Sequence, residues 1–527
     1  MGALEVSRLG FTFAGGATLF DEVSFRVGEG HHVALVGANG AGKTTLVRLI
    51  AGDEAGHTGT ISIDGRLGVM RQFIGSVRDE TTTVRDLLVS LSPPPIRDAA
   101  SVLAAAERAN ADEATTASGL RYAEALTAWG DRGGYEAEVR WDTCTTVALR
   151  AHLDEVGGRL LGTLSGGEQK RLALELLLRS DDDVLLLDEP DNYLDVPGKE
   201  WLTAALRESK KTVLFVSHDR QLLSDVADRV VTLEARAAWT HGGSFATWAA
   251  ARQDRLARLD EEHRRWQEER KRMEDQVREL RRQLTMSDAA ASRLRATQSK
   301  IRRHEAAAPP ERPKDQSVVM RLGGDRTGKR AIVIEGLSLT GLVSPFSTEV
   351  LFGERIGVLG LNGTGKTHFL RLLSGSTEVA HEGRWSLGAH VVPGYFSQTH
   401  DHPELVGRRL VDVLQDVGLG LGPAMAALRR YELSGAAQQP FETLSGGQQA
   451  RLQILLLELT GATLLLLDEP TDNLDVASAE ALEDALAMFT GTVVAVTHDR
   501  WFMRAFDRFL VFRRDGSVAE SIDPMYE

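Results

Sequence analysis

The chain has 527 residues, of which 42% are hydrophobic and 26% are charged, and its formal net charge is -14. This length exceeds what one hydrophobic core supports, so two or more domains are expected, and the composition excludes a disordered or collagen-like chain. The single cysteine, Cys144, excludes an internal disulfide and disfavours a cysteine-based zinc or iron–sulfur site. The acidic total does not exclude a nucleic-acid partner, because a basic patch can lie on an acidic body.

Apolar segments in this sequence are short. The N-terminus lacks a basic stretch followed by an apolar core, and no apolar run approaches the roughly 18 residues of a membrane span. The longest runs, 184–187 and 464–467, are typical of buried strands. We therefore expect a cytoplasmic protein with no membrane segment.

A glycine-rich loop occurs in each half of the chain, at 37–44 and at 360–367, with the sequences Gly-Ala-Asn-Gly-Ala-Gly-Lys-Thr and Gly-Leu-Asn-Gly-Thr-Gly-Lys-Thr. Each loop follows an apolar strand pattern and precedes a helical one, as a phosphate-binding loop does. In such loops backbone N–H groups at a helix N-terminus hold the phosphates of ATP and the lysine adds a positive charge. The predicted ATP-binding residues here are Gly37, Asn39, Gly40, Gly42, Lys43, Thr44 and Thr45, and in the second loop Gly360, Asn362, Gly363, Gly365, Lys366, Thr367 and His368.

Three further motifs recur in the same order after each loop. Leu-Ser-Gly-Gly begins at residues 164 and 444, Leu-Asp-Glu-Pro at 187 and 467, and His-Asp-Arg at 218 and 498. The motif serine and the first aspartate are 23 residues apart in both halves, and the glutamate and the histidine are 29 residues apart. The chain therefore contains two copies of one domain. We expect an α/β fold with two P-loop domains.

The acidic motifs predict the catalytic chemistry. Each aspartate ends an apolar strand, where its carboxylate can hold Mg²⁺ together with the loop threonine, so the predicted metal ligands are Thr44, Asp188, Thr367 and Asp468, acting through ATP. The following glutamate can orient or deprotonate the attacking water, and the histidine after the next strand can reach the terminal phosphate. The predicted catalytic residues are Glu189, Glu469, His218 and His498. Gln72 and Gln398 lie in short apolar contexts and are predicted to sense the metal or the water.

The two copies differ before the Leu-Ser-Gly-Gly motif. From Gln72 to Ser165 the chain advances 93 residues, but from Gln398 to Ser445 only 47. The first copy thus holds 46 extra residues within about 73–163, and its Ala- and Glu-rich part predicts a helical arm. Phe13, before the first loop, is a candidate adenine stacker, and packing in the core is the equal alternative.

Between the copies, bulky residues recur in steps of three and four from Leu256 to Leu284, which predicts a long helix with a heptad seam. Residues 285–291 lack the seam and are predicted to turn the chain into an antiparallel return helix that ends before Pro309. Residues 251–280 hold nine basic and nine acidic residues, whereas 281–303 hold seven basic residues and one acidic residue. The candidate RNA contacts are Arg281, Arg282, Arg293, Arg295, Lys300, Arg302 and Arg303. The basic face alternatively serves as a solvated surface.

These motifs resemble those of ATP-binding cassette proteins. In that superfamily two cassettes pair head to tail, so the resemblance implies that each Leu-Ser-Gly-Gly segment completes the nucleotide site of the other copy. Ser165, Gly166, Gly167 and Glu168 would then bind ATP at the second loop, and Ser445, Gly446, Gly447 and Gln448 at the first. Closure on ATP would be a movement of one half against the other.

The whole chain resembles the ABC-F family, in which one polypeptide holds two cassettes joined by a charged, coiled-coil α-helical hairpin and lacks a membrane domain. Phe245 and Trp248 before the charged helix match the start of that family's linker. The predicted domains are a first cassette at 1–243, a hairpin linker at 244–316 and a second cassette at 317–527. The resemblance implies ATP and Mg²⁺ as cofactors, and the ribosome as partner, with the linker directed toward rRNA and tRNA near the peptidyl-transferase region; no DNA partner is expected.

Some positions depart from the family pattern. Asp191 and Tyr193 stand where threonine and histidine are usual, His368 replaces a second hydroxyl residue, and no aromatic residue matches Phe13 before the second loop. These differences predict two unequal ATP sites.

Two further roles stay open. One is antibiotic resistance by ribosome protection, which the rather short hairpin disfavours relative to a general translation factor. The other is the ATPase subunit of a transporter with a separate membrane partner, which has no need of a basic hairpin. Double-cassette ATPases of DNA repair and ribosome recycling usually carry cysteine clusters, which one cysteine excludes.

Overall fold

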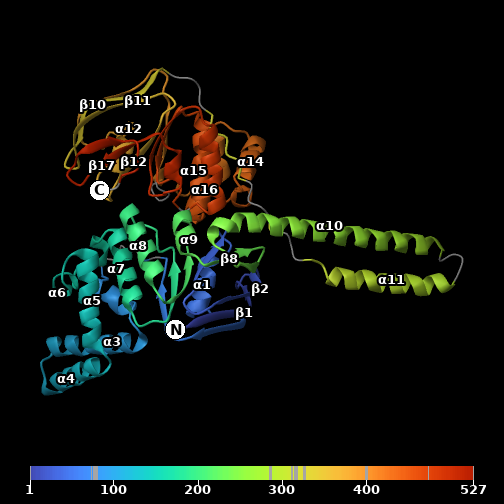
Figure 1. Ribbon diagram of the computed structural model, residues 1–527, viewed down its shortest axis with the longest axis horizontal. Helices are drawn as coiled ribbons and strands as arrows, with labels where there is room; N and C mark the ends of the chain where they lie inside the picture. Colours follow the sequence, from blue (N-terminus) through green and yellow to red (C-terminus); the bar gives the residue numbers. More distant parts are fainter. Residues whose placement is uncertain are drawn as a thin grey trace.

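A computed structural model describes residues 2–72, 74, 81–283, 288–309, 313, 318–323, 328–397, 402–472 and 474–525. Two α/β bodies face each other, and a helical hairpin projects from the side of the pair (Figure 1). Gln398 and residues 284–287 of the predicted turn lie outside the described residues. We refer to the body before the hairpin as the first cassette and to the body after it as the second cassette.

The first cassette is built on a six-stranded sheet with the order β5-β6-β7-β3-β8-β9, in which the pairs are parallel except for β8 and β9. A three-stranded antiparallel sheet, β2-β1-β4, lies against it. The strands of this cassette are β1 (Ala3–Thr12), β2 (Thr18–Val27), β3 (His32–Gly37), β4 (Thr58–Asp64), β5 (Leu67–Met70), β6 (Val184–Asp188), β7 (Thr212–Val216), β8 (Arg229–Glu234) and β9 (Ala237–His241).

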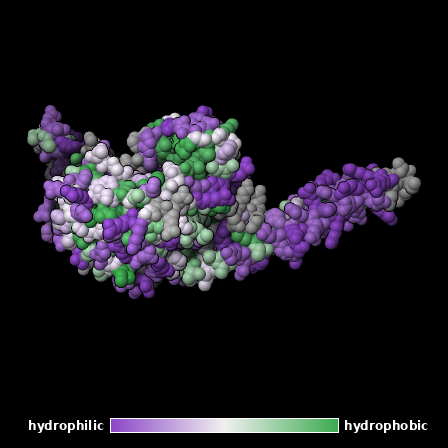
Figure 2. All heavy atoms as spheres, turned by 90° about the horizontal axis from the view of Figure 1, so that it is seen from above, coloured by the Kyte–Doolittle hydropathy of each residue, from purple (hydrophilic) through white to green (hydrophobic). Residues whose placement is uncertain are grey.

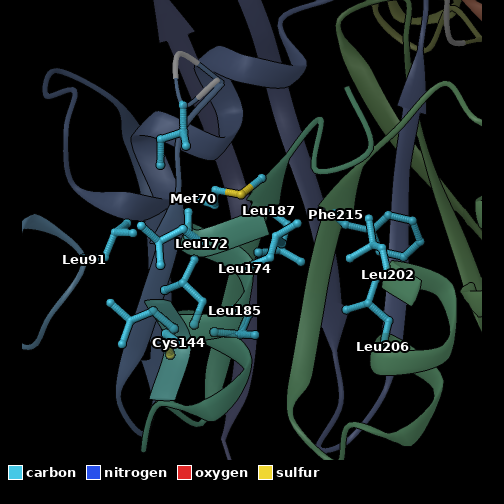
Figure 3. Close-up of a cluster of buried hydrophobic side chains, with 14 of the residues drawn as sticks. Met70, Leu91, Cys144, Leu172, Leu174, Leu185, Leu187, Leu202, Leu206 and Phe215 are labelled. Atoms are coloured by element: carbon cyan, nitrogen blue, oxygen red, sulfur yellow. The ribbon is translucent and has the colours of Figure 1, made fainter. Parts of the chain in front are cut away.

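The central strands are buried on both faces because helices and the small sheet cover them. On β6, Leu185 and Leu187 join the cluster with α7 and α8, while Val184 and Leu186 face the small sheet. Figure 3 shows part of the first cluster, with Leu172 and Leu174 beside these strands. The helices are α1 (Lys43–Ala51), α2 (Val84–Ser90), α3 (Pro94–Asp112), α4 (Thr116–Asp131), α5 (Gly134–Leu149), α6 (Leu153–Val156), α7 (Gly166–Arg179), α8 (Val196–Glu208) and α9 (Arg220–Val226), with a short 3-10 helix η1 (Leu161–Thr163).

The second cassette repeats this topology, with sheets ordered β14-β15-β16-β12-β17-β18 and β11-β10-β13. Its strands are β10 (Arg330–Leu339), β11 (Val343–Leu351), β12 (Arg355–Gly360), β13 (His381–Leu387), β14 (Pro393–Phe396), β15 (Leu464–Asp468), β16 (Thr492–Val496), β17 (Arg508–Phe512) and β18 (Val518–Ser521). Its helices are α12 (Lys366–Leu373), α13 (Leu410–Asp416), α14 (Leu421–Arg430), α15 (Gly446–Thr460) and α16 (Val476–Met488), with 3-10 helices η2 (Pro403–Leu405), η3 (Ser434–Ala436), η4 (Phe441–Thr443) and η5 (Phe502–Ala505). The internal duplication expected from the motifs is thus a duplication of fold.

The extra residues of the first cassette form the antiparallel pair α3 and α4, at the far side of the molecule from the hairpin (Figure 1). Pro94 begins α3, where its missing N–H costs nothing. The Thr115 hydroxyl accepts a hydrogen bond from the N–H of Ser118 at 3.1 Å and so caps α4. In the second cassette the shorter helices α13 and α14 connect the corresponding strands.

The hairpin consists of α10 (Phe245–Gln283) and α11 (Asp288–Ala306). As the heptad pattern predicts, Leu256, Leu259, Val277 and Leu280 are buried, and Trp266 pairs with His304 of the return helix in a ring stack at 5.3 Å between centroids. Arg270 also falls in the predicted three-and-four spacing, four residues after Trp266, but it is exposed and pairs with Glu274 at 2.9 Å. The return helix begins at Asp288, so 288–291, predicted as turn, are helical. Figure 2 shows an almost entirely hydrophilic surface on this projection.

The first cassette anchors the base of α10. Phe245 is buried in the cassette core and stacks on Trp248, whose indole N–H donates to the Thr232 hydroxyl at 2.8 Å. Glu234 of β8 accepts hydrogen bonds from Arg252 and Arg255, both at 3.0 Å. After the hairpin, Val318 and Met320 pack into the core of the second cassette. The hairpin therefore connects to both bodies, and its first helix is fixed to the first.

Within the described residues, no single helix is long and apolar enough to cross a membrane. The consecutive helices α13 and α14 together meet the criteria of length and composition, but the pair is bent by 119°.

Candidate active sites

Two pockets lie between the cassettes, and each is lined from both of them. The first, of about 380 Å³, contains the glycine-rich loop of the first cassette and the Leu-Ser-Gly-Gly segment of the second. Its walls include these residues predicted from the sequence: Phe13, Asn39, Gly40, Gly42, Lys43, Thr44, Thr45, Gln72, Glu189, His218, Ser445, Gly446 and Gly447.

The second pocket, of about 410 Å³, has the reciprocal composition. Its walls include Asn362, Gly363, Gly365, Lys366, Thr367, His368, Asp468, Glu469 and His498 of the second cassette, with Ser165, Gly166 and Gly167 of the first. The structure thus brings together the loop of one copy and the motif of the other, in the head-to-tail arrangement that the resemblance implied.

Each glycine-rich loop is shaped by left-handed glycines at a helix start. Gly42 has φ 97° and caps α1, and Gly365 has φ 96° and caps α12, a conformation that a residue with a Cβ atom adopts only with strain. The buried ammonium of Lys43 donates to the carbonyl oxygens of Gly37 at 2.8 Å and Ala38 at 3.2 Å. Lys366 does the same in the second loop, with Gly360 at 2.7 Å. Gly37 and Gly360 therefore act as carbonyl acceptors behind the pocket walls.

The catalytic glutamate candidates share an unusual backbone. Glu189 has φ 51° and Glu469 has φ 49°, in the left-handed region that non-glycine residues seldom occupy. Each backbone N–H is held at 2.9 Å by the carbonyl of the neighbouring strand, Val216 or Val496. Strain of this kind, enforced by the surrounding structure, is typical of functional positions.

The two carboxylates have different partners. Glu189 accepts hydrogen bonds from the side-chain amides of Gln72 at 2.9 Å and Asn192 at 2.7 Å. Glu469 instead accepts from the backbone N–H of His498 at 2.9 Å, and the His498 ring lies 3.4 Å from its other oxygen. Burial, reinforced by the charge of Asp472, raises the pKa of Glu469 to about 8. Burial also lowers the pKa of both histidines, so both imidazoles are neutral near pH 7.

The predicted metal ligands lie together in both sites. Thr367 donates its hydroxyl to Asp468 at 3.3 Å, and burial raises the pKa of Asp188 to about 6 and also raises that of Asp468. Among the described residues, one buried carboxylate oxygen of Asp188 and one of Asp468 have no hydrogen-bond partner. A buried acidic oxygen beside a threonine hydroxyl fits Mg²⁺ held jointly with ATP phosphates, because this ion takes few protein ligands.

The two pockets differ at the end where adenine is predicted to bind. In the first, Phe13 follows β1, is 48% exposed and meets Phe11 edge-on at 5.3 Å between ring centroids. In the second, the connection from β10 to β11 spans only residues 340–342, and Leu342 lines the pocket. The first pocket therefore offers an aromatic face to a base, and the second offers an aliphatic side chain.

The motif serines begin helices. Ser165 and Ser445 cap α7 and α15, and the side chains of Glu168 and Gln448 turn back to accept from the serine N–H groups at 2.8 Å and 3.0 Å. Glu168 and Gln448 thus form capping boxes and line neither pocket, unlike the neighbouring glycines, although both were predicted to bind ATP. Both side chains fix the helix starts, and their binding of ATP stays a prediction.

Direct contacts join each loop to the opposite cassette. The backbone N–H of Asn39 donates to Asp475 at 2.9 Å, and the Asn362 side chain donates to the carbonyl of Tyr193 at 3.2 Å. Val196 of the first cassette packs with Leu359, Met503, Phe509 and Val511 of the second. The pair is therefore closed, with polar and apolar contacts across the interface.

Several site residues were not predicted from the sequence. Lys170 donates to the carbonyl of Glu189 at 2.7 Å, and Asn192, Lys199, Leu342 and Asp472 line the pockets. Aligning the two copies position by position could have flagged Asn192 and Asp472, which lie two residues after the acidic motifs. Lys199 and Leu342 belong to no motif: Lys199 contacts the opposite cassette, and Leu342 packs beside Gly365 in the loop of its own cassette.

The candidate RNA contacts lie on the hairpin. Charged residues along α10 form local ion pairs, such as Arg264 with Glu261 at 2.7 Å and Arg278 with Asp275 at 2.6 Å. In contrast, five basic residues of α11 are exposed and form no ion pair with any described residue: Arg293, Arg295, Lys300, Arg302 and Arg303. Arg281 and Arg282, near the end of α10, are also exposed.

Comparison with known proteins places these features in a family. A family model described as ABC transporter matches residues 20–192 and 343–472, and a second model with the same description matches 231–320, which includes the hairpin. The chain is 52% identical, over the full length of both proteins, to a Mycobacteroides abscessus protein named "Antibiotic resistance protein". It is 28% identical to the Mycobacterium tuberculosis "Energy-dependent translational throttle protein EttA", covering 93% of this chain and 87% of that protein.

The chain belongs to the ABC-F family. Two cassette domains that bind ATP make this ABC-F protein an ATPase of the cassette type. Among solved structures, an archaeal ribosome recycling factor in complex with a ribosomal stalk protein has a TM-score of 0.58 at 20% identity, covering 96% of this chain and 87% of that one. This likeness supports the tandem-cassette fold.

Proposed function

We propose that this ABC-F protein binds the ribosome in its ATP-bound, closed form, modulates translation through its hairpin, and leaves the ribosome after hydrolysing ATP to ADP and phosphate. The observation that carries the proposal is the unequal charge of the hairpin. The five exposed basic residues of α11, which we call the α11 basic cluster, have no acidic partner among the described residues, whereas α10 has as many acidic as basic residues over 251–280 and pairs several of its arginines internally. Unpaired basic side chains suit rRNA or tRNA phosphates.

The geometry of the pockets supports ATP as the switch for this binding. Each pocket is complete only when the cassettes meet, because the loop and the Leu-Ser-Gly-Gly segment come from different copies. ATP bound to both surfaces would therefore favour the closed form, and loss of the terminal phosphate would weaken it. In each site the glutamate would act on the water, the histidine on the terminal phosphate, and the aspartate and threonine on Mg²⁺.

The test is co-sedimentation with 70S ribosomes. The variant Glu189→Gln/Glu469→Gln should bind ATP without hydrolysing it and should be enriched in the ribosome pellet relative to the wild type. The matched control is Lys43→Ala/Lys366→Ala, which weakens phosphate binding and should stay in the supernatant. Equal sedimentation of both variants with ATP would contradict the proposal.

The role of the hairpin in ribosome binding is tested by removing its basic side chains. Replacing the α11 basic cluster with glutamine should weaken ribosome binding and reduce its salt dependence by about 0.7 to 0.9 in log–log slope for each phosphate that is no longer neutralised, with the ATPase rate of the free protein retained. The control replaces Arg264, Arg265, Arg270 and Arg278, which already pair within α10. If both sets have the same effect, the location of the charge is irrelevant and the proposed RNA-binding surface is wrong.

A second role, protection of the ribosome from an antibiotic, is favoured by one observation. The relative with 52% identity over its full length carries the name "Antibiotic resistance protein". Expression of the chain in a sensitive bacterial host should then raise the inhibitory concentration of a ribosome-targeting drug, and the α11 glutamine variant should not. An unchanged inhibitory concentration across drugs that bind the peptidyl-transferase region would favour a general translation factor.

A further inference from the structure

The two pockets share a wall. Four side chains line both cavities: Asp191, Asn192 and Lys199 of the first cassette and Asp472 of the second. Lys199, which projects from α8, is the one cation among these four. A residue in this position can transmit a change in one site directly to the other.

Lys199 makes contacts on both sides of the interface. Its side chain is 9% exposed, and its ammonium lies 3.3 Å from a carboxylate oxygen of Asp219 in its own cassette. The same ammonium donates a hydrogen bond at 3.3 Å to the backbone carbonyl of His498, in the second cassette. Although burial opposes the charge, the carboxylates of Asp219 and Asp191 outweigh it and raise the pKa of Lys199, so the ammonium is charged at neutral pH.

The carbonyl that Lys199 holds belongs to a catalytic segment. His498 uses its backbone N–H to bond one oxygen of Glu469 at 2.9 Å, and its ring approaches the other oxygen at 3.4 Å. Lys199 is therefore separated from the Glu469 carboxylate by a single residue. Displacement of His498 would change the direction in which Glu469 faces the water.

The internal repeat supplies a control for this contact. The position that corresponds to Lys199 in the second cassette is Ala479, and the one that corresponds to Asp191 is Thr471. The first site consequently receives no ammonium from an equivalent position, and Glu189 is held by Gln72 and Asn192 instead. At these two positions the first cassette has an aspartate and a lysine, and the second cassette has two uncharged residues.

The competing explanation is that Lys199 only compensates the charge of a buried carboxylate. Asp219 and Arg220 are matched by Asp499 and Arg500 in the second cassette, and these four residues pair across the interface, with Arg500 3.6 Å from Asp219 and Arg220 3.4 Å from Asp499. Asp191 is buried outside these pairs, so Lys199 could serve only to neutralise it. That explanation does not account for the bond to the His498 carbonyl, which contributes nothing to the charge of Asp191.

We propose that Lys199 is a positioning residue through which the first cassette orients His498 and Glu469, so that hydrolysis in the second site depends on a side chain of the first cassette. The first site does not depend on the second cassette in the same way, because Ala479, at the corresponding position, has no ammonium group. The proposal rests on ATP hydrolysis at both sites, as proposed above, and it concerns the protein without the ribosome.

The experiment separates the sites with glutamate variants. Lys199→Met is made in the Glu189→Gln background, where the second site retains its glutamate, and in the Glu469→Gln background, where the first does. Single-turnover hydrolysis of bound ATP reports the chemical step of the remaining site. We expect about a 10-fold or greater fall in the second-site rate, as for other losses of alignment, with little change in the ATP concentration for half-saturation and less than a 3-fold change in the first-site rate.

A matched control and a double variant keep the test decisive. Lys211→Met removes a half-buried lysine that bonds the carbonyls of Ser180 and Asp182, away from the interface, and should leave both rates unchanged. Asp191→Thr/Lys199→Ala recreates the pair found in the second cassette, so it should recover any melting temperature lost in Lys199→Ala while the second-site rate stays low.

Two outcomes would overturn the proposal. One is an equal fall of both rates in Lys199→Met, and the other is recovery of the second-site rate together with the melting temperature in the double variant, which would reduce Lys199 to charge compensation. Because no ribosome is present, failure of ribosome binding leaves this result unaffected. If neither glutamate background hydrolyses ATP above the level of the double glutamate variant, hydrolysis at separate sites is refuted, and this inference with it.

Discussion

The two sites use the same motifs at the same spacing but hold their glutamates by different means. In the first, Glu189 is fixed by amide groups of its own cassette, from Gln72 and Asn192. In the second, Glu469 is fixed by His498, whose carbonyl is bound by Lys199 from the opposite cassette. The motifs therefore determine where the glutamates lie, with their shared left-handed backbone, and the surrounding residues determine how each one is oriented.

The largest expected difference between the sites concerns the histidines. Only His498 contacts its glutamate; among the described residues His218 makes no hydrogen bond to Glu189. We expect His498→Ala to lower second-site hydrolysis by about 100-fold, since it removes both the ring contact and the proposed partner of the terminal phosphate, and His218→Ala to lower first-site hydrolysis by about 10-fold. Single-turnover rates in the two glutamate-variant backgrounds measure this; equal losses would mean that the sites work alike despite their different contacts.

A smaller difference is expected at the adenine end. Stacking on an aromatic ring contributes about 1 to 3 kcal/mol per base, so Phe13→Ala should raise the ATP dissociation constant of the first site by about 10-fold. Leu342→Ala should change that of the second site by less than about 3-fold. Titration with a fluorescent ATP analogue and competition by GTP test both variants. Since Phe13 is half exposed, the melting temperature of its variant should hardly change, and an unaltered affinity would assign Phe13 to packing with Phe11.

The smallest expected effect is on the pH profile. Glu469 must be a carboxylate to accept a proton from water, and burial raises its pKa to about 8. Below that pH most of the second site holds the protonated acid, so its hydrolysis rate should increase about 8-fold from pH 7 to pH 8.5. The rate is measured in the Glu189→Gln variant, with the Glu469→Gln variant assayed in parallel for the first site. A second-site rate that is constant over this range would contradict the assignment of Glu469 as base.

Much of the fold followed from the sequence because the relevant information is local. A phosphate-binding loop needs glycine where the backbone is left-handed, as at Gly42. A strand that is buried on both faces needs a continuous run of apolar residues, as in the run that ends at Asp188. Both structures could therefore be predicted from a short stretch of sequence. The heptad seam of the hairpin is local in the same sense. The turn was predicted too long because 288–291 lack seam residues, although their alanines favour helix.

The remaining features of the sites depend on contacts between distant segments. Glu168 belongs to a motif that is predicted to bind nucleotide, and only the geometry shows that its side chain closes a capping box. Lys199 lies in an ordinary surface-like helix pattern, and its hydrogen bond reaches His498 of the second cassette, nearly 300 residues away along the chain. The sequence of a short segment does not show which distant residue that segment will contact. Comparison of the two copies does show the positions at which they differ.

The rigid attachment of α10 gives the hairpin a mechanical property. Phe245, Trp248 and the two arginines bound to Glu234 fasten the helix base to the first cassette, so the helix turns with that body. Its 39 residues extend about 58 Å at 1.5 Å per residue. A rotation of the first cassette by about 10° would therefore sweep the far end through about 10 Å, so that an ångström-scale rearrangement around a phosphate becomes a displacement comparable to the width of a nucleotide.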